Sequence, residues 1–599
     1  MSERRSLGRL ILLLTLAAFG AACVHPSRDV VATPLGARMD DYLTRLSGYG
    51  YSGATLVAKD GRILLRKGYG FANDNARVPV TASTVFDIGS LAKPFTAAAV
   101  LLMEKRGLLS LDDPIAKHLD GVPENKREIT VRQLLAHTSG LDTEFPYEHP
   151  SGEDYEEVDR DEAVRRILAM PLVDRPGAGW KYSNPGYVLA AAIVERVGGR
   201  PFRTFLRTEL FQPAGMRSTG FWGSGLPEVP DDRLARSYDE AGETADLRKR
   251  SSTTWFDLGG GEIVSTVDDL YAWMEALRSG RILPREVCTA MWTPAAPGGK
   301  YGLGWFIETA GGTLRIHHGG DYNGFGAELA YYPDAHLVMV NLANRRHQVL
   351  GTRYAADRVL PAMALGGTIE MWPGEPFDLP PPWSGTLPDP LRRAVGTYRL
   401  PTGGEFVIAP AGEDALSIAA RGQDAVDVLY PGTAADLALR RRSTERVVAM
   451  VDGVRRGDTT ALATTLREGA PLEAYRAGIG SLLDAKEHGT LRAIEAIATV
   501  PVAFPRGGRD TVLAFKFERD TSYIRFGWSR QQDRVINMGE GGPLLATTPL
   551  RASPESGLVG WNIVSGRALR LSVRAEAARV VALTLTRPDG SRTEARRPA

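Results

Sequence analysis

Ser90 and Lys93 form the only Ser-x-x-Lys sequence of the chain, within TVFDIGSLAKPFTAAAVLLMEKRG. The apolar stretch after Lys93 predicts a helix that begins near Ser90, and residues three positions apart share one helix face, so the hydroxyl and the ammonium can touch. A helix N-terminus also offers unpaired N–H groups and a positive dipole end. A nucleophile, a base and N–H donors for an oxyanion are what acyl transfer needs. The alternative is a plain helix N-cap followed by a solvated lysine.

Tyr182 and Asn184 form the only Tyr-x-Asn sequence, in DRPGAGWKYSNPGYVLAAAIVERVGG. Ser183 or Asn184 can cap the helix that follows, and Pro185 suits its first turn. Tyr182 is therefore expected on a loop just before a buried helix. The alternative is an aromatic side chain that only packs beside the helix start.

His318, Gly319 and Gly320 follow an apolar strand in TLRIHHGGDYNGFGAELAYYP. The two glycines let another backbone or a substrate approach closely. A His-His pair in this position could also belong to a loop or to half of a metal site. No HExxH, CxxC or His-x-His-x-Asp sequence exists to complete such a site, so no metal is expected.

The order of these three motifs resembles the serine hydrolases related to class C β-lactamases, a group that includes D-alanyl-D-alanine peptidases, D-aminopeptidases and carboxylesterases. Other stretches agree: ITVRQLLAHTSGL (129–141), with a capping box from Thr130 to Gln133, GGGEIVSTVDDLYAWMEAL (259–277) and YGLGW (301–305). The resemblance covers about residues 36–365.

The resemblance implies a role for each motif. Ser90 attacks a carbonyl, and the backbone N–H groups of Ser90 and Asp321 hold the oxyanion. Lys93 and Tyr182 share the transfer of the serine proton to the leaving group, and which of them is the base stays open. Asn184 binds the acyl-side amide or orients Lys93. No cofactor is implied.

The third motif departs from the β-lactamase pattern. His318 replaces a lysine and Gly319 replaces a hydroxyl residue, and both replaced groups face the substrate carboxylate in those enzymes. A histidine is only partly charged at neutral pH, so recognition of an anionic β-lactam or D-Ala terminus should be weak. We therefore expect an enzyme for esters or D-amino-acid amides and peptides, in which Lys at 318 and Thr at 319 would raise cephalosporin turnover.

Two other functions remain as alternatives. The first is a D-alanyl-D-alanine carboxypeptidase or β-lactamase with the same machinery. The second is a non-catalytic sensor of peptidoglycan-like ligands, which the retained Ser90, Lys93 and Tyr182 disfavour.

The composition and the N-terminal residues limit the binding partners and the cellular compartment to be expected. The chain has 599 residues and a formal net charge of +1, so it should hold several domains and has no electrostatic footprint for nucleic acid. Residues 1–23 have a basic start, an apolar stretch and small residues before Cys23, which predicts a signal peptide or lipoprotein signal. Export to the periplasm, or anchoring to the membrane through a lipidated Cys23, follows. The alternative is that residues 10–22 form an uncleaved anchor helix, which would also export the domain.

The pattern of elements predicts a β-lactamase/transpeptidase-like α/β (α+β) domain. A helix over 36–48 and a hairpin turned at Asp60-Gly61 precede a mostly helical region, and strands return only near 302–342. The first and last parts should therefore share one antiparallel sheet, flanked by helices and a helical lobe. Loops 142–160 and 218–250 should shape the substrate rim, with these aromatic residues as candidate contacts: Tyr147, Tyr155, Phe221 and Trp222.

The C-terminal half carries no catalytic motif, so binding or docking to other proteins, or a lid, is its expected role. Short strands after residue 391 predict a small β domain, and alternating strands near 511–528 predict an α+β domain similar to nuclear transport factor 2. The expected units are the hydrolase domain (30–370), a Pro-rich linker (371–390), the small β domain (391–440 and 541–599) and the α+β domain (441–540).

Overall fold

The computed structural model describes residues 29–598, except for a set of short internal stretches. These stretches are 144–156, 239–242, 248–253, 296–298, 311, 346–351, 367–386, 412–414, 468–469, 471, 485–487, 502–507, 530–532, 541–544, 554–556, 563–566, 577–578 and 588–589. The expected signal, Cys23, Tyr147, Tyr155 and most of the Pro-rich linker lie outside the described residues. In the part of the chain that is described, no helix is both long and apolar enough to cross a membrane.

One antiparallel sheet organises the first half of the chain, in the order β1-β3-β2-β14-β13-β12-β11. Its strands are β1 (Val30–Val31), β2 (Gly53–Lys59), β3 (Arg62–Tyr69), β11 (Phe306–Ala310), β12 (Thr313–Tyr322), β13 (Phe325–Tyr332) and β14 (Leu337–Ala343). The β2–β3 hairpin turns at Asp60 and Gly61, both at positive φ. Leu337 of β14 pairs with Lys59 of β2, so the expected joining of early and late strands is confirmed.

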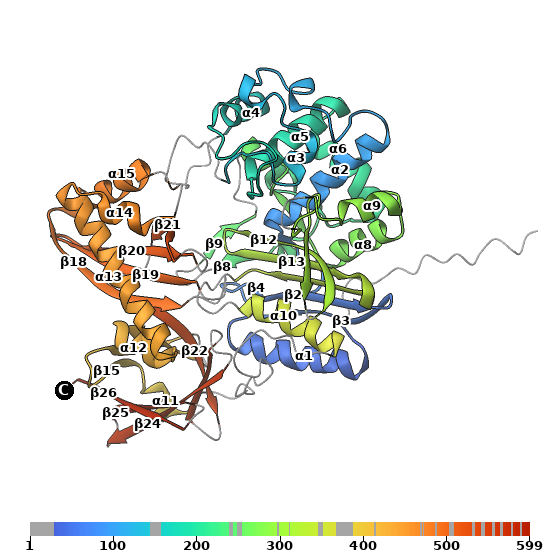
Figure 1. Ribbon diagram of the computed structural model, residues 1–599. Helices are drawn as coiled ribbons and strands as arrows, with labels where there is room; N and C mark the ends of the chain where they lie inside the picture. The colour runs from blue at the N-terminus through green and yellow to red at the C-terminus, as the bar shows by residue number, and fades with distance from the viewer. Residues whose placement is uncertain are drawn as a thin grey trace, which may run out of the picture.

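Two helices cover one face of this sheet, α1 (Thr33–Gly48) and α10 (Thr352–Leu365) (Figure 1). Met39 and Leu43 of α1 pack with Val359 and Leu360 of α10 in one buried cluster. The apolar period read in residues 36–48 is the reason that this helix lies on the sheet.

A helical lobe covers the other face. Its helices are α2 (Lys93–Lys105), α3 (Val131–Leu135), α4 (Arg160–Ala169), α5 (Asn184–Gly198), α6 (Phe202–Leu206), α7 (Gln212–Ala214), α8 (Val267–Arg278) and α9 (Arg285–Met291). Phe95 of α2 stacks on Trp273 of α8 with ring centroids 4.4 Å apart. The predicted capping box of Thr130 and Gln133 starts α3, and Ser183 caps α5.

Short strands form three further small sheets among the described residues of the first half of the chain. They are β4 (Phe71–Asn73), β5 (Val78–Pro79), β6 (Phe86–Asp87), β7 (Gly220–Phe221), β8 (Arg236–Tyr238), β9 (Glu243–Asp246) and β10 (Ile263–Ser265). Phe221 and the following Trp222 are 1% and 2% exposed. The prediction that these two aromatic residues line the substrate rim is therefore wrong, because both are packed in the core.

The C-terminal half begins with a closed barrel, whose strands come from two separate stretches of sequence. They are β15 (Gly396–Arg399), β16 (Glu405–Pro410), β17 (Leu416–Arg421), β22 (Leu545–Ser553), β23 (Gly557–Asn562), β24 (Arg567–Glu576), β25 (Arg579–Thr586) and β26 (Arg592–Arg596). The helix α11 (Asp389–Arg392) precedes the barrel.

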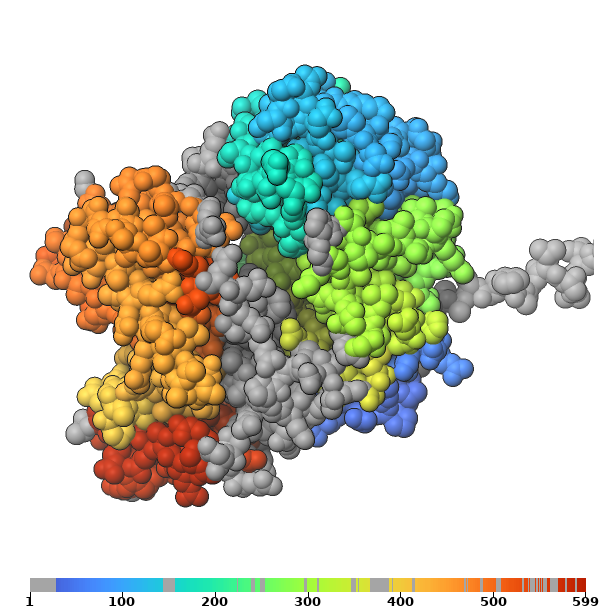
Figure 2. All heavy atoms as spheres, viewed as in Figure 1, coloured from blue at the N-terminus to red at the C-terminus, as the bar shows by residue number. Residues whose placement is uncertain are grey.

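An α+β unit is inserted between β17 and β22. It follows α12 (Gln423–Leu429) and consists of α13 (Ala434–Arg456), α14 (Thr460–Thr465), α15 (Leu472–Leu483), β18 (Leu491–Pro501), β19 (Arg509–Phe517), β20 (Thr521–Trp528) and β21 (Val535–Glu540). The alternating apolar residues of β19 and β20 meet helix α13 in one core. Helix α13 runs across the expected boundary at residues 440–441. Figure 2 shows this unit and the barrel on the same side of the hydrolase domain.

Candidate active site

Ser90 and Lys93 lie where β6 leads into α2. Ser90 is on the 3₁₀ turn η1 (Gly89–Ala92), and Lys93 is the first residue of α2. Residues three apart eclipse one another on a 3₁₀ turn, and Lys93 Nζ lies 3.0 Å from Ser90 Oγ. Lys93 is 0% exposed, so the alternative of a solvated lysine is wrong.

The ammonium of Lys93 has few polar neighbours to stabilise its charge. It donates to the carbonyl of Gly260 at 3.0 Å, and its Nζ lies 4.8 Å from the ring centre of Tyr182. Burial lowers the pKa of Lys93 to about 7. In a large fraction of the molecules the Lys93 amine is therefore neutral at physiological pH and able to accept the proton of Ser90.

Tyr182 lies beside Ser90, directly before the Ser183 cap of α5. Its hydroxyl is hydrogen-bonded to Ser90, but burial raises the pKa of Tyr182 well above its usual value. The phenol therefore keeps its proton at neutral pH. This geometry favours Lys93 as the group that takes the serine proton and Tyr182 as the group that passes one on.

His137 is a residue of this site that the sequence reasoning missed. Its ring lies 4.3 Å from the ring of Tyr182, and its Nδ1 accepts a hydrogen bond of 3.0 Å from the backbone N–H of Ser183. Burial, followed by the charge of Lys93, lowers the pKa of His137 well below its usual value. His137 thus supports Tyr182 as a neutral ring. Its place in LLAHTSGL was visible, but only the fold brings it to Tyr182.

Backbone atoms of η1 and β12 meet beside Ser90. Gly89 has a φ of +48°, and a Cβ at this position would lie 3.0 Å from the N atom of Asp321. A Cβ on Gly320 would overlap the carbonyl oxygen of Ile88. The glycines therefore let β12 approach η1, which brings the N–H groups expected to hold the oxyanion, those of Ser90 and Asp321, to adjacent segments.

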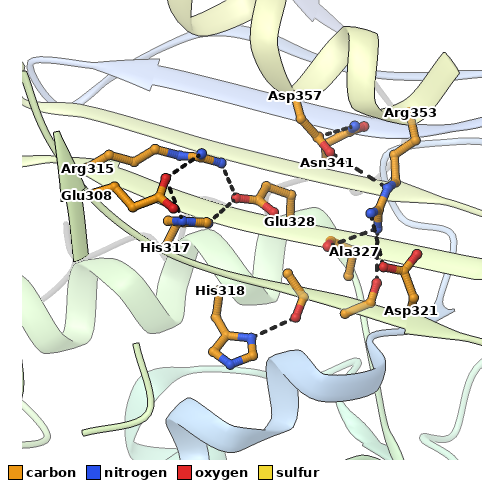
Figure 3. A network of polar contacts seen from close by, with 12 residues as sticks. Glu308, Arg315, His317, His318, Asp321, Ala327, Glu328, Asn341, Arg353 and Asp357 are labelled. Carbon is orange, nitrogen blue, oxygen red and sulfur yellow. Dashed lines mark hydrogen bonds and ion pairs between the residues drawn. The ribbon is translucent and has the colours of Figure 1, made fainter. Parts of the chain in front are cut away.

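His318 points toward η1, on the opposite side of β12 from His317 and Glu328 (Figure 3). Its Nδ1 lies 2.6 Å from the Gly319 carbonyl oxygen, which can only accept, so Nδ1 carries the proton. Its Nε2 lies 3.0 Å from the hydroxyl of Tyr301. Burial, then the charge of Lys93, lowers the pKa of His318 to about 3. The expectation of a partly charged His318 at neutral pH is therefore wrong.

Gly319 and Asn184 occupy less direct positions. A Cβ on Gly319 would lie 3.0 Å from Glu328 Oε2, on the face of the sheet away from Ser90. Asn184 is the first residue of α5, and its Nδ2 donates to the Thr143 carbonyl at 3.3 Å. The contacts that orient Lys93 are those to Ser90 and to Gly260, whose part in the site the sequence reasoning did not foresee.

An aromatic wall borders the site. Trp180 is 41% exposed, and its ring lies 6.0 Å from Tyr301 and 6.3 Å from Phe306. Phe306 in turn stacks on Tyr182 at 6.5 Å. Such a surface favours an apolar group on the substrate. Among the described residues, no three His, Cys, Asp or Glu side chains gather in a way that could hold a metal ion.

Comparison with known proteins identifies the family of the chain. The family described as Beta-lactamase matches residues 39–363, more than half of the chain. Penicillin-binding protein 4* of Bacillus subtilis (strain 168) is 27% identical over 421 residues, which cover 66% of this chain and 89% of the relative. Esterase EstB of Burkholderia gladioli is 31% identical over 309 residues, which cover 45% of this chain and 77% of the relative.

A solved structure shares the fold over a longer stretch. The octameric penicillin-binding protein homologue from Pyrococcus abyssi has 20% sequence identity and a TM-score of 0.51, covering 83% of this chain and 97% of that chain. The resemblance expected from the three motifs is confirmed, as is the β-lactamase/transpeptidase-like fold class. The chain belongs to the Beta-lactamase family and is a serine hydrolase of that family.

Proposed function

We propose that the protein is an exported serine hydrolase that cleaves uncharged esters and D-amino-acid amides or peptides through an acyl-enzyme on Ser90. The observation that carries this proposal is the contact of 3.0 Å between Ser90 Oγ and a fully buried Lys93. A lysine that is partly neutral near pH 7 is a base matched to its task.

The chemistry proceeds in two steps. Neutral Lys93 takes the proton of Ser90 while Oγ bonds to the substrate carbonyl carbon, and the N–H groups of Ser90 and Asp321 hold the oxyanion. Tyr182 donates its proton to the leaving oxygen or nitrogen and regains one from Lys93. A water molecule then attacks the acyl carbon and loses a proton to neutral Lys93. The bond from that carbon to Ser90 Oγ breaks, Oγ takes the proton back, and the acid is released.

The charge around the third motif supports an uncharged substrate. His318 is neutral at physiological pH, so it does not bind a carboxylate as a cation would, and position 319 faces Glu328, away from Ser90. Gly320 and Asn184 would instead contact the acyl side through backbone and amide groups. Trp180 supplies an exposed aromatic surface for an apolar group, and one relative is named an esterase.

The second candidate is a D-alanyl-D-alanine carboxypeptidase or β-lactamase. It is supported by the relative named a penicillin-binding protein, and it requires a cation for the substrate carboxylate. Because His318 is neutral, we place it second. A non-catalytic sensor does not need a lysine with a lowered pKa beside Ser90, so this function is the least supported of the three.

The test compares phenyl esters, D-alanine anilide and nitrocefin as substrates for the wild-type protein, Ser90→Ala and a control, Ser110→Ala. We expect ester or anilide turnover that falls by about 10³-fold or more in Ser90→Ala and is unchanged in Ser110→Ala. Turnover that survives Ser90→Ala would refute the nucleophile. Nitrocefin cleavage that is faster than ester cleavage would refute the substrate class.

Export and the roles of the C-terminal units are part of the proposal. Residues 1–23 would direct the chain to the periplasm, with Cys23 as the lipid attachment point if the protein is anchored. The barrel and the α+β unit would bind other proteins or cover the site. Cell fractionation of the wild-type protein and Cys23→Ala tests the anchor, because only the wild-type protein should partition with membranes.

A further inference from the structure

A buried arginine lies behind the strand that carries the expected oxyanion donor. Arg353 is in the first turn of α10, on the face of the sheet opposite Ser90, and is 6% exposed. Its Nη1 donates to the carbonyl oxygen of Gly320 at 3.0 Å and to that of Ala327 at 3.2 Å, and its Nη2 contacts Asp321 Oδ2 at 3.2 Å. One guanidinium thus joins β12 to β13 (Figure 3).

A glycine makes room for this guanidinium. A Cβ on Gly326 of β13 would lie 2.5 Å from Arg353 Nη1, closer than nonbonded atoms pack. Gly326 pairs with Asp321 across the two strands. Strand β13 therefore carries no side chain at the position where the Arg353 guanidinium contacts β12 and β13.

A chain of buried polar groups holds Arg353 in place. Its Nε lies 3.7 Å from Asp357 one helical turn later, and Asp357 accepts a hydrogen bond of 2.6 Å from Asn341 of β14. Asn341 in turn accepts hydrogen bonds from Tyr51 at 2.5 Å and from Thr55 of β2 at 3.1 Å. Connected networks of this kind fix a single arrangement, because each lost bond leaves a buried group unsatisfied.

We propose that Arg353 is a positioning residue for the oxyanion strand. Gly320 packs directly against the backbone of Ile88 on the side of η1, and Arg353 donates a hydrogen bond to the Gly320 carbonyl from the side of α10. Strand β12 is therefore held from both sides at the residue before Asp321. The N–H of Asp321 is thereby kept facing Ser90. This inference depends on the proposed function only through the role of that N–H.

The expected size of the effect follows from the value of an oxyanion donor. Removal of one donor costs about 10²- to 10³-fold in kcat, and a displaced strand loses part of that. Arg353→Gln should therefore lower kcat by about 10- to 100-fold and leave KM within about threefold, since the donor acts mainly in the transition state. Arg353→Lys keeps the charge, but it has no fork to contact the Gly320 and Ala327 carbonyls and the Asp321 carboxylate together, so its kcat should lie in between.

The control is Lys59→Met. Lys59 Nζ donates to the Ala364 carbonyl at the other end of α10, at 3.0 Å, so this variant loosens the same helix without touching β12. We would measure kcat, KM, thermal unfolding and the inhibition constant of an aryl boronic acid, whose tetrahedral adduct places an oxygen in the oxyanion site. The inhibition constant should rise in Arg353→Gln by the same factor by which kcat falls, and should not change in Lys59→Met.

Three results would overturn the inference. They are an Arg353→Gln variant with wild-type kcat, a loss of kcat without weaker boronate binding, or an equal loss in Lys59→Met at matched thermal stability. If Arg353→Gln does not fold, Arg353→Lys carries the same test. A wild-type protein that hydrolyses no ester or amide would instead refute the proposed function, which keeps the two failures distinct.

Discussion

The pH dependence of catalysis is the sharpest consequence of the buried Lys93. Burial moves the pKa of this amine from 10.5 to about 7, which corresponds to about 5 kcal/mol at about 1.4 kcal/mol for each pKa unit. An unperturbed lysine would be neutral in only about one molecule in 3,000 at pH 7. In this site about half are neutral, so the base is available where the enzyme works.

The magnitude follows from the fraction of neutral Lys93. We expect kcat/KM to rise with pH and to level off above pH 8. At pH 5 about one lysine in 100 is neutral, so the rate should be about 50-fold below that at pH 7. Tyr182 adds no fall on the alkaline side below pH 10, because burial raises its pKa.

Initial rates with phenyl acetate between pH 4.5 and 10, with products separated by chromatography, would measure this profile. His318 and His137 cannot produce the rise, because both have lowered pKa values. His317 is the exception: burial and Arg315 oppose its protonation, but Glu328 and Glu308 outweigh them and raise its pKa. His317→Gln is therefore the control. A profile that is flat from pH 5 to 9, rises only near pH 10, or disappears in His317→Gln would refute the reasoning.

Three further predictions concern the same site. Lys93→Met should be inactive yet more stable than the wild-type protein. Its advantage in free energy of unfolding, measured by calorimetry, should be about 2 kcal/mol larger at pH 7 than at pH 9, because the folded wild-type protein binds fewer protons than the unfolded one over this range. His318→Lys combined with Gly319→Thr should lower ester turnover and stability, because the threonine Cβ meets Glu328. Contrary to the expectation from sequence, it should not raise cephalosporin turnover, and faster nitrocefin cleavage would contradict this. Gly320→Ala should cost about 100-fold in kcat and about 3 kcal/mol of stability, because its Cβ overlaps Ile88; wild-type esterase rates in this variant would show that β12 need not touch η1.

Local sequence rules predicted the elements that carry the site. The Ser-x-x-Lys spacing placed a hydroxyl and an amine on one turn, and the hairpin at Asp60-Gly61 and the cap at Ser183 formed where their residue types favour them. Each of these features depends on residues that are close together in the sequence, so a stretch of a few residues is enough to predict it. The apolar strands after residue 302 predicted the late half of the sheet for the same reason.

Features that depend on burial and on distant partners could not be predicted in this way. His318 was expected to be partly charged, but the structure buries it beside Lys93 and Tyr301, and the charge is lost. Phe221 and Trp222 lie in a stretch without periodicity, which suggested a surface loop, yet they pack in the core. Arg353 lies 32 residues beyond Asp321 in the sequence, and no local pattern marks their contact.

The pairing of β2 with β14 has a consequence for synthesis of the chain. Lys59 and its partner Leu337 are about 280 residues apart, and ribosomes add roughly 5–20 residues per second. The N-terminal hairpin must therefore wait about 15–60 s before β14 exists, with the edge of β2 open to other chains. Yield in cells should accordingly depend on whatever covers that edge in the interval, a requirement that refolding of the finished chain does not impose.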